Sequence, residues 1–347
     1  MHTPTHTPHE RKLPAELLPT TSWKRLWLNI AGTLLLVLVA NWAAGSYLSL
    51  HTPNKGYWIV STKWDVLLKM DTPVDTLVLG DSSALQAFIP AVWQTETGER
   101  AANQAVIGSL GVLNDAWMLQ VYLARFGPPK RVIVIHVYDI WQRPLSNETL
   151  QRIPIRTYRG HKLQPALEFS WTERLDALPL GVPLYSENYS LRRVALAWLE
   201  NPLDWRAVLA QPFQLEPGGY DKLTQPEPET VHSDLLEHLN FLAEHTFEIS
   251  PLNQAALDEL VQLSEQYGFA LYLANGPLFD GLAQDPAFQT YFAALSAHFE
   301  ALAARHASVD FMGIIATFPA DQLESVDHTI HPSAVIYTRQ LAREILK

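Results

Sequence analysis

The sequence contains no cysteine among its 347 residues. This absence excludes disulfide bonds, thiolate metal ligands and cysteine nucleophiles. Charged residues make up only 18% of the chain and the net charge is −11, so a basic surface for nucleic acid is not expected. The glycines form no dinucleotide- or phosphate-binding loop, so we expect no nucleotide or redox cofactor. The thirteen histidines show no ligand-quality spacing, and we expect no metal site.

A long uncharged stretch is present near the N-terminus, over residues 26–50. About 20 apolar residues suffice to span a bilayer as a helix. Lys24 and Arg25 precede the stretch, which predicts a cytoplasmic leader (1–25), a single transmembrane anchor and an extracytoplasmic remainder. The alternative is a cleaved signal peptide, but the leader is long and no clean small-residue cleavage site follows.

The rest of the chain alternates between strand-like and helix-like segments. Residues 51–75 are expected to form a linker with a short amphipathic piece. Apolar, β-branched runs predict strands at 76–79, 131–136, 269–274 and 308–311, with a less distinct one at 100–102. Helices are predicted at 112–126, 253–267, 287–306 and 333–346. Such alternation favours an α/β domain over 76–347 with a flavodoxin-like three-layer parallel sheet. Residues 142–250 break the rhythm, and we expect a large helical or loop-rich insert there.

Two motifs follow predicted strands. The first is Gly80-Asp81-Ser82, where a serine stands at the carboxyl end of a buried strand, the edge at which open α/β sheets bind ligands. Gly80 permits a tight turn, and the amides after it can face a developing negative charge. The second motif runs from Asn103 to Gly108, and its glycine lets the backbone approach an oxyanion.

A third motif lies just before the last predicted helix. It reads Asp327-His328-Thr329-Ile330-His331-Pro332. A serine nucleophile needs a base, and the base needs an orienting acid. We expect His331 to be the general base toward Ser82 and Asp327 to orient its ring. His328 is the alternative base.

Together the three motifs resemble those of the SGNH (GDSL-type) hydrolase superfamily, over about residues 74–140 and 268–347. The resemblance implies that Ser82 is the nucleophile and that the backbone amides of Ser82 and Gly108 are oxyanion donors, with Asp81 and Asn103 supporting the site from behind. Pro332 after His331 fits the family pattern. The family's third block, Gly-x-Asn-Asp, is not matched, because Tyr138 stands where its asparagine is expected.

The layout is similar to a membrane-anchored branch of that superfamily, the alginate O-acetyltransferase and D-alanyl-lipoteichoic-acid transfer types. This implies an O-acyltransferase or carboxylic ester hydrolase acting on an envelope glycan or another acylated surface polymer. A multi-pass membrane acyltransferase is the implied partner. One alternative is a non-catalytic scaffold in an envelope polymer modification complex, which the missing asparagine supports. Another is a lipase-like esterase that faces the membrane.

Overall fold

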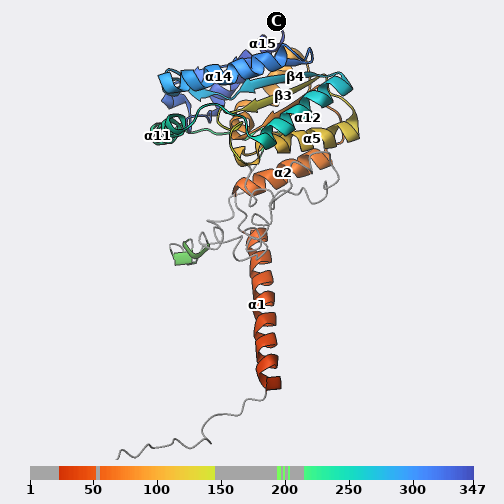
Figure 1. The fold of residues 1–347 in the computed structure, drawn as a ribbon, viewed down its shortest axis with the longest axis vertical. Coiled ribbons are helices and arrows are strands. Elements are labelled where there is room, and N and C mark those ends of the chain that lie inside the picture. The colour runs from red at the N-terminus through yellow and green to blue at the C-terminus, as the bar shows by residue number, and fades with distance from the viewer. Residues whose placement is uncertain (1–22, 52–54, 145–193, 197, 200–201, 204–214) are drawn as a thin grey trace, which may run out of the picture.

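The computed structural model describes residues 23–51, 55–144, 194–196, 198–199, 202–203 and 215–347. Most of the predicted leader and much of the predicted insert over 142–250 lie outside these ranges. Within them the chain forms a mixed α/β domain that follows an N-terminal helix (Figure 1).

Five parallel strands form the central sheet, in the order β2-β1-β3-β4-β6. Their bounds are β1 Thr76–Gly80, β2 Ala101–Asn103, β3 Arg131–His136, β4 Ala270–Asn275 and β6 Val309–Ile314. The predicted parallel sheet is therefore confirmed, and a strand lies at each of the five predicted places. The middle strands are nearly continuous apolar runs because helices cover both faces of the sheet. A separate pair of short parallel strands is formed by β5 Leu278–Phe279 and β7 Thr317–Phe318.

Helices pack on both sides of this sheet. Figure 1 shows β3 and β4 between α15 on one side and the neighbouring helices α5 and α12 on the other. The helices α3 and α4 pack against α15, and α14 lies along the edge strand β6 and contacts α11. The helix bounds are α3 Ser82–Ala87, α4 Pro90–Thr97, α5 Gly111–Phe126, α11 Pro228–Glu244, α12 Pro251–Tyr267, α13 Asp280–Ala283, α14 Pro286–Ala303 and α15 His331–Ile345, with short 3-10 turns η2 Gly108–Leu110 and η6 Ala320–Gln322.

Local sequence explains where these helices begin and end. The side chain of Ser250 accepts a hydrogen bond from the amide of Asn253, Pro251 occupies the first turn, and Gly268 ends α12 in the left-handed conformation. Asp285 caps α14 in the same way, also before a proline. The four predicted helices therefore form close to their predicted bounds.

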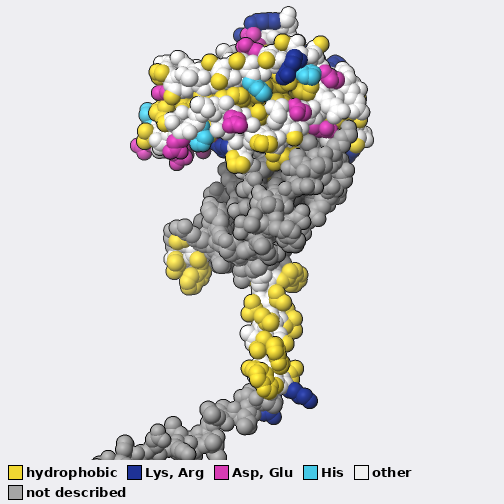
Figure 2. Space-filling view, viewed as in Figure 1, with side chains coloured by type: hydrophobic (Ala, Val, Ile, Leu, Met, Phe, Trp, Pro, Cys, Tyr) yellow, Lys and Arg dark blue, Asp and Glu magenta, His cyan; other side chains and the backbone are white. Residues whose placement is uncertain are grey.

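The N-terminal helix α1, Trp23–His51, is long and apolar enough to cross a membrane. Its most hydrophobic part, Trp23–Ala44, has a mean hydropathy of 1.7 and is almost entirely exposed. Figure 2 shows a hydrophobic surface along this helix and basic side chains at its far end. An exposed apolar helix of this length is consistent with a segment that crosses a membrane.

The helix α2, Lys55–Lys69, belongs to the α/β domain. Val60, Trp64 and Leu67 lie in the hydrophobic core, and the Trp64 indole donates to Asn114 Oδ1 of α5 at 3.1 Å. The side chain of Lys63 is completely buried and donates to the carbonyl oxygen of Asn103 at 2.6 Å. The predicted linker over 51–75 is thus largely a helix packed on the domain.

Gly80 is the position where the fold depends most visibly on glycine. Its φ of 138° is rarely adopted by other residues, and a β-carbon there would overlap the carbonyl oxygen of Ile135 in the neighbouring strand. We expect Gly80→Ala to lower the free energy of unfolding by about 3 kcal/mol or more, because overlap with backbone cannot relax cheaply.

The matched control for this prediction is Gly98→Ala. Gly98 also has a positive φ, 74°, but no atom lies within 4 Å of a β-carbon added there. Its substitution should lower the free energy of unfolding by only about 1–2 kcal/mol, the cost of a left-handed backbone conformation for a residue other than glycine. Urea unfolding of the full chain in detergent measures both variants, and equal losses would contradict the role assigned to the overlap.

Candidate functional site

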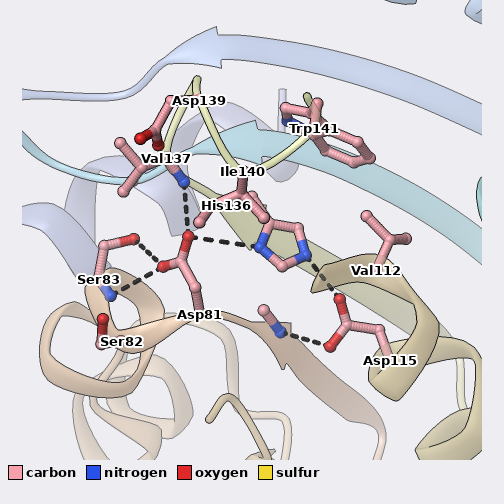
Figure 3. A network of polar contacts seen from close by, with 12 residues as sticks. Asp81, Ser82, Ser83, Val112, Asp115, His136, Val137, Asp139, Ile140 and Trp141 are labelled. Carbon is pink, nitrogen blue, oxygen red and sulfur yellow. Dashed lines mark hydrogen bonds and ion pairs between the residues drawn. The ribbon is translucent and has the colours of Figure 1, made fainter. Parts of the chain in front are cut away.

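Ser82 begins α3 directly after the end of β1. The Asp81 side chain caps this helix by accepting the amide hydrogen of Ser83 at 2.8 Å. The sharp turn at Gly80 lifts Ser82 to the carboxyl edge of the sheet, where Figure 3 shows it beside Asp81 and Ser83. The structure therefore places this serine at the edge predicted from the sequence.

The imidazole of His328 contacts Ser82. The distance between Ser82 Oγ and His328 Nε2 is 2.9 Å, a hydrogen-bond distance suited to proton transfer. The loop that carries His328 is closed by a bridge between Leu323 and Thr329, and Thr329 Oγ1 donates to the carbonyl oxygen of Gln86 in α3 at 3.0 Å. The fold thus attaches the histidine loop to the helix that Ser82 begins.

Three side chains surround the other ring nitrogen of His328. Its Nδ1 lies 2.7 Å from Ser325 Oγ, 3.4 Å from Asp327 Oδ1 and 3.5 Å from Glu324 Oε2. Ser325 Oγ in turn donates to Asp327 Oδ1 at 3.0 Å. With Nδ1 protonated and donating to Ser325, Nε2 is left to accept the proton of Ser82. The carboxylate of Asp327 then acts on the ring partly through a serine hydroxyl.

The electrostatic surroundings of His328 favour its charged form. Burial alone would lower the pKa of the ring, but the negative charges of Asp327, Glu324 and Asp81 outweigh it and raise the pKa of His328 to about 9. The side chain remains 23% exposed, so the ring is buried enough to be positioned and open enough to be reached. A base with a raised pKa accepts the serine proton readily once it is neutral.

The prediction that His331 faces Ser82 is wrong. His331 is the first residue of α15, its amide donates to the carbonyl oxygen of Leu223 at 2.8 Å, and its Nδ1 lies 3.1 Å from Tyr220 Oη. Burial and the charge of Lys222 lower the pKa of this ring. Pro332 sits in the first turn of α15, so it marks the start of a helix and not the position of the base.

Signals for the observed arrangement were nevertheless present in the sequence. Ser325 stands three residues before His328 and Glu324 stands four before it, so both are close to His328 in sequence. Asp327, the predicted acid, immediately precedes His328 and does lie beside its ring. Ser325 and Glu324 were not predicted, because the orienting acid was expected before His331.

Two backbone amides near Ser82 are free to bind an oxyanion. Gly108 begins the turn η2, and a β-carbon placed on it would lie 3.7 Å from the Cβ of Asp81. The strand-like segment before it is held by Val106, whose amide donates to the carbonyl oxygen of Gly80 at 2.9 Å. Within the described ranges, the amides of Ser82 and Gly108 have no protein acceptor. The structure thus brings Gly108 close to the turn that carries Ser82.

Asn103 supports the site from behind. Its side-chain amide donates to the carbonyl oxygens of Ala84 and Phe88, each at 2.9 Å, and its oxygen accepts the amide of Ala105 at 3.0 Å. The residue is completely buried. Asn103 therefore holds α3 and the Gly108 segment together and does not face substrate.

Tyr138 does not replace the missing asparagine as an oxyanion donor. Its ring is buried against Phe288 and Tyr291, and its hydroxyl lies 2.7 Å from Nδ1 of His238. Burial and the charges of Asp139 and Asp327 raise its pKa. The tyrosine belongs to an aromatic cluster beside the site.

A guanidinium group stands close to Gly108 instead. Arg143 Nε donates to Asp139 Oδ2 at 3.0 Å, and Arg143 Nη1 lies 3.7 Å from the position of a β-carbon on Gly108. The side chain is 48% exposed, and its charge interacts with those of Asp327 and Asp81. Arg143 thus places a positive charge beside the candidate oxyanion position.

No cluster of three metal-ligating side chains with suitable geometry occurs in the described part of the chain. No protein-family model matches the sequence, and no curated protein matches it significantly.

Proposed function

We propose that this protein is a membrane-anchored serine acyltransferase or esterase that acts on an envelope polysaccharide or another acylated surface polymer. The observation that carries the proposal is the 2.9 Å contact between Ser82 Oγ and His328 Nε2, with Ser325, Asp327 and Glu324 around the other ring nitrogen. The base is His328, and not the residue expected from the sequence. A serine, a histidine and an orienting acid form the arrangement used for acyl transfer in unrelated folds.

The chemistry begins with attack of Ser82 Oγ on the carbonyl carbon of an acyl donor, while its proton passes to His328 Nε2. The backbone amides of Ser82 and Gly108 donate hydrogen bonds to the carbonyl oxygen and stabilise the negative charge that develops on it. His328 then returns the proton to the leaving group, and an acyl-enzyme ester remains on Ser82. A sugar hydroxyl or water then attacks the acyl carbon while His328 takes its proton. The bond between Ser82 Oγ and the acyl group breaks, and His328 returns the proton to Ser82, which completes a transferase or an esterase cycle.

The topology supports placement in the SGNH-like, flavodoxin-like group of folds. The strand order β2-β1-β3-β4-β6 corresponds to the order 2-1-3-4-5 of flavodoxin-like sheets. In such sheets ligands bind outside the carboxyl ends of the strands. Ser82 and Gly108 follow the ends of β1 and β2, two neighbouring strands, which agrees with that rule.

The proposed location rests on α1. Lys24 and Arg25 at the start of this apolar helix support a cytoplasmic N-terminus, and the α/β domain is accordingly proposed to lie on the extracytoplasmic side. A domain tethered there reaches envelope polymers directly. A multi-pass membrane acyltransferase is the proposed source of the acyl group, as the resemblance to anchored polymer-modifying proteins implies.

The test is covalent labelling of the full chain in detergent with a fluorophosphonate probe, which reacts with activated serines. We expect wild-type protein to be labelled at Ser82 and Ser82→Ala to be unlabelled at unchanged thermal stability. Absence of labelling in folded wild-type protein would reject the catalytic proposal and favour the non-catalytic scaffold. Supplying an acylated donor with and without a glycan acceptor then separates transfer from hydrolysis.

Arg143 gives a prediction specific to this site. Because its Nη1 stands beside Gly108, we expect Arg143→Gln to slow labelling by about 100-fold, the usual cost of losing one donor to an oxyanion. The matched control is Arg339→Gln, which removes an exposed arginine paired with Glu96 at 3.0 Å and should change the rate little. Equal rates for the two variants would remove Arg143 from the oxyanion site.

A further inference from the structure

Three ionisable side chains lie completely buried behind Ser82. His136 Nδ1 is 3.3 Å from Asp81 Oδ2, and His136 Nε2 is 2.6 Å from Asp115 Oδ2. We call these residues the buried trio; Figure 3 shows the histidine ring between the two carboxylates. They come from the β1–α3 turn, α5 and the end of β3. The reaction described above uses none of them as a proton donor or acceptor.

While both carboxylates are ionised, the geometry defines the protonation of the ring. Both nitrogens of His136 face carboxylate oxygens, and a neutral imidazole would direct a lone pair at one of them. Two donors are therefore needed, so the ring is an imidazolium while both acids are ionised. Burial alone would lower its pKa, but Asp115 and Asp81 outweigh burial and raise the pKa of His136 to about 10.

The trio connects the backbone segments that build the site. Asp81 accepts the amide of Ser83 at 2.8 Å and, through its other oxygen, the amide of Val137 at 2.7 Å. Asp115 Oδ1 accepts the amide of Gly80 at 3.1 Å. The β1–α3 turn that carries Ser82 is thereby joined to the end of β3 and to α5. The helix α5 follows directly after η2, the short turn that Gly108 begins.

The remaining groups near the trio are few. The charges of Arg143 and His328 interact with the charge of Asp81. The hydroxyl of Tyr337 on α15 also interacts electrostatically with Asp81, and it donates to the carbonyl oxygen of Asn275 at 2.8 Å. The ring of Trp141 meets His136 edge-on, with centroids 5.2 Å apart. The positive charge between the two carboxylates is therefore the one supplied by His136 itself.

We propose that His136 and Asp115 are positioning residues for Ser82. They hold the β1–α3 turn, which carries Ser82, against α5 only while His136 is protonated. This inference rests on the proposed function, because its consequence is measured as the reactivity of Ser82. Neither residue touches substrate. They act through Asp81, whose contacts with Ser83 and Val137 set the turn.

Asp115→Asn is the variant that tests the charge without removing the contacts. The asparagine oxygen still accepts the Gly80 amide, and its NH2 group donates to a neutral His136 ring, so the variant favours loss of the histidine proton. The fluorophosphonate labelling rate is measured from pH 5 to 10 on the full chain in detergent. The protonation of His136 is followed in the same samples by NMR of 13C-labelled histidine, assigned with His136→Gln.

We expect labelling of Asp115→Asn to be slower than wild type by about tenfold or more at each pH where His136 is neutral, and to recover where it is protonated, since small displacements of a nucleophile have effects of this size. The control is Tyr122→Phe, also on α5, which loses buried hydrogen bonds to Val74 at the opposite end of β1. It should label like wild type at all pH values.

A rate within twofold of wild type while His136 is neutral would overturn the inference. So would a deficit of the same size in both protonation states, because that indicates a purely structural loss. If Asp115→Asn does not fold, the labelling rate of the wild type is measured between pH 8 and 10.5. A decline in this rate must then coincide with the titration of His136.

Failure of the proposed function has a different signature. It leaves wild type unlabelled at every pH. The positioning role is then read from hydrogen exchange of the Ser83 and Val137 amides, which should accelerate as His136 loses its proton and would stay constant if the inference is wrong.

Discussion

Replacing His328 with alanine is expected to slow fluorophosphonate labelling of Ser82 by about 10²-fold to 10⁴-fold, the range attributed to a positioned general base. The reason is the direct contact of its Nε2 with Ser82 Oγ. Without that ring no other described side chain is in place to take the serine proton. The measurement is the second-order labelling rate of the full chain in detergent near pH 9.

His331→Ala is the matched control for this prediction. His331 is also a histidine of the C-terminal region, but it contacts Tyr220 and not Ser82. We expect its substitution to change the labelling rate by less than about threefold, with a loss of stability near 1 kcal/mol for one hydrogen bond. A large loss in His331→Ala together with normal labelling of His328→Ala would reverse the assignment.

The pH dependence of labelling is expected to show the second large effect. The general base works only as the neutral ring, and the pKa of His328 is raised to about 9. Below that value the neutral fraction falls tenfold for each pH unit, so the rate at pH 7 should be about 100-fold below its plateau. Labelling rates of the wild-type protein measured from pH 5.5 to 10 test this rise of the rate with pH.

Glu324→Gln provides the matched variant for the pH profile. Glu324 is one of the charges that raise the pKa of His328, so its neutralisation should move the limb to lower pH and speed labelling at pH 7. The control is Glu344→Gln, an exposed glutamate at the end of α15 that pairs with Lys347. The prediction would be contradicted by a wild-type labelling rate that stays constant between pH 6 and 9. It would also be contradicted if Glu324→Gln did not shift the pH range over which the labelling rate rises.

Local patterns in the sequence were enough for the sheet and for part of the site. The run Thr76–Gly80 is apolar and β-branched, and it is buried along its length as the second strand of the sheet. Ser82 and Gly108 follow strand ends, and neighbouring parallel strands bring such positions to one edge. These features depend on neighbours in sequence or on a general property of parallel sheets.

The choice of base could not be predicted in the same way. His328 and His331 lie three residues apart, and their roles are decided by where α15 begins. The helix starts at His331 and turns that ring toward Tyr220, while the bridge between Leu323 and Thr329 directs His328 to Ser82. A proline that suits the family pattern equally suits the first turn of a helix, so Pro332 does not distinguish the two histidines.

An apolar helix long enough for a membrane, an alternating α/β domain and a serine at a strand end were predictable from the sequence, because periodicity and turn chemistry are local. The identity of the base and the buried trio of Asp81, Asp115 and His136 became apparent only in the folded structure. Those residues are far apart in the chain, and each contact between them requires a sheet, a helix and a turn to be packed together. Burial then decides their charges, because a carboxylate or an imidazolium withdrawn from water is stable only beside its partner.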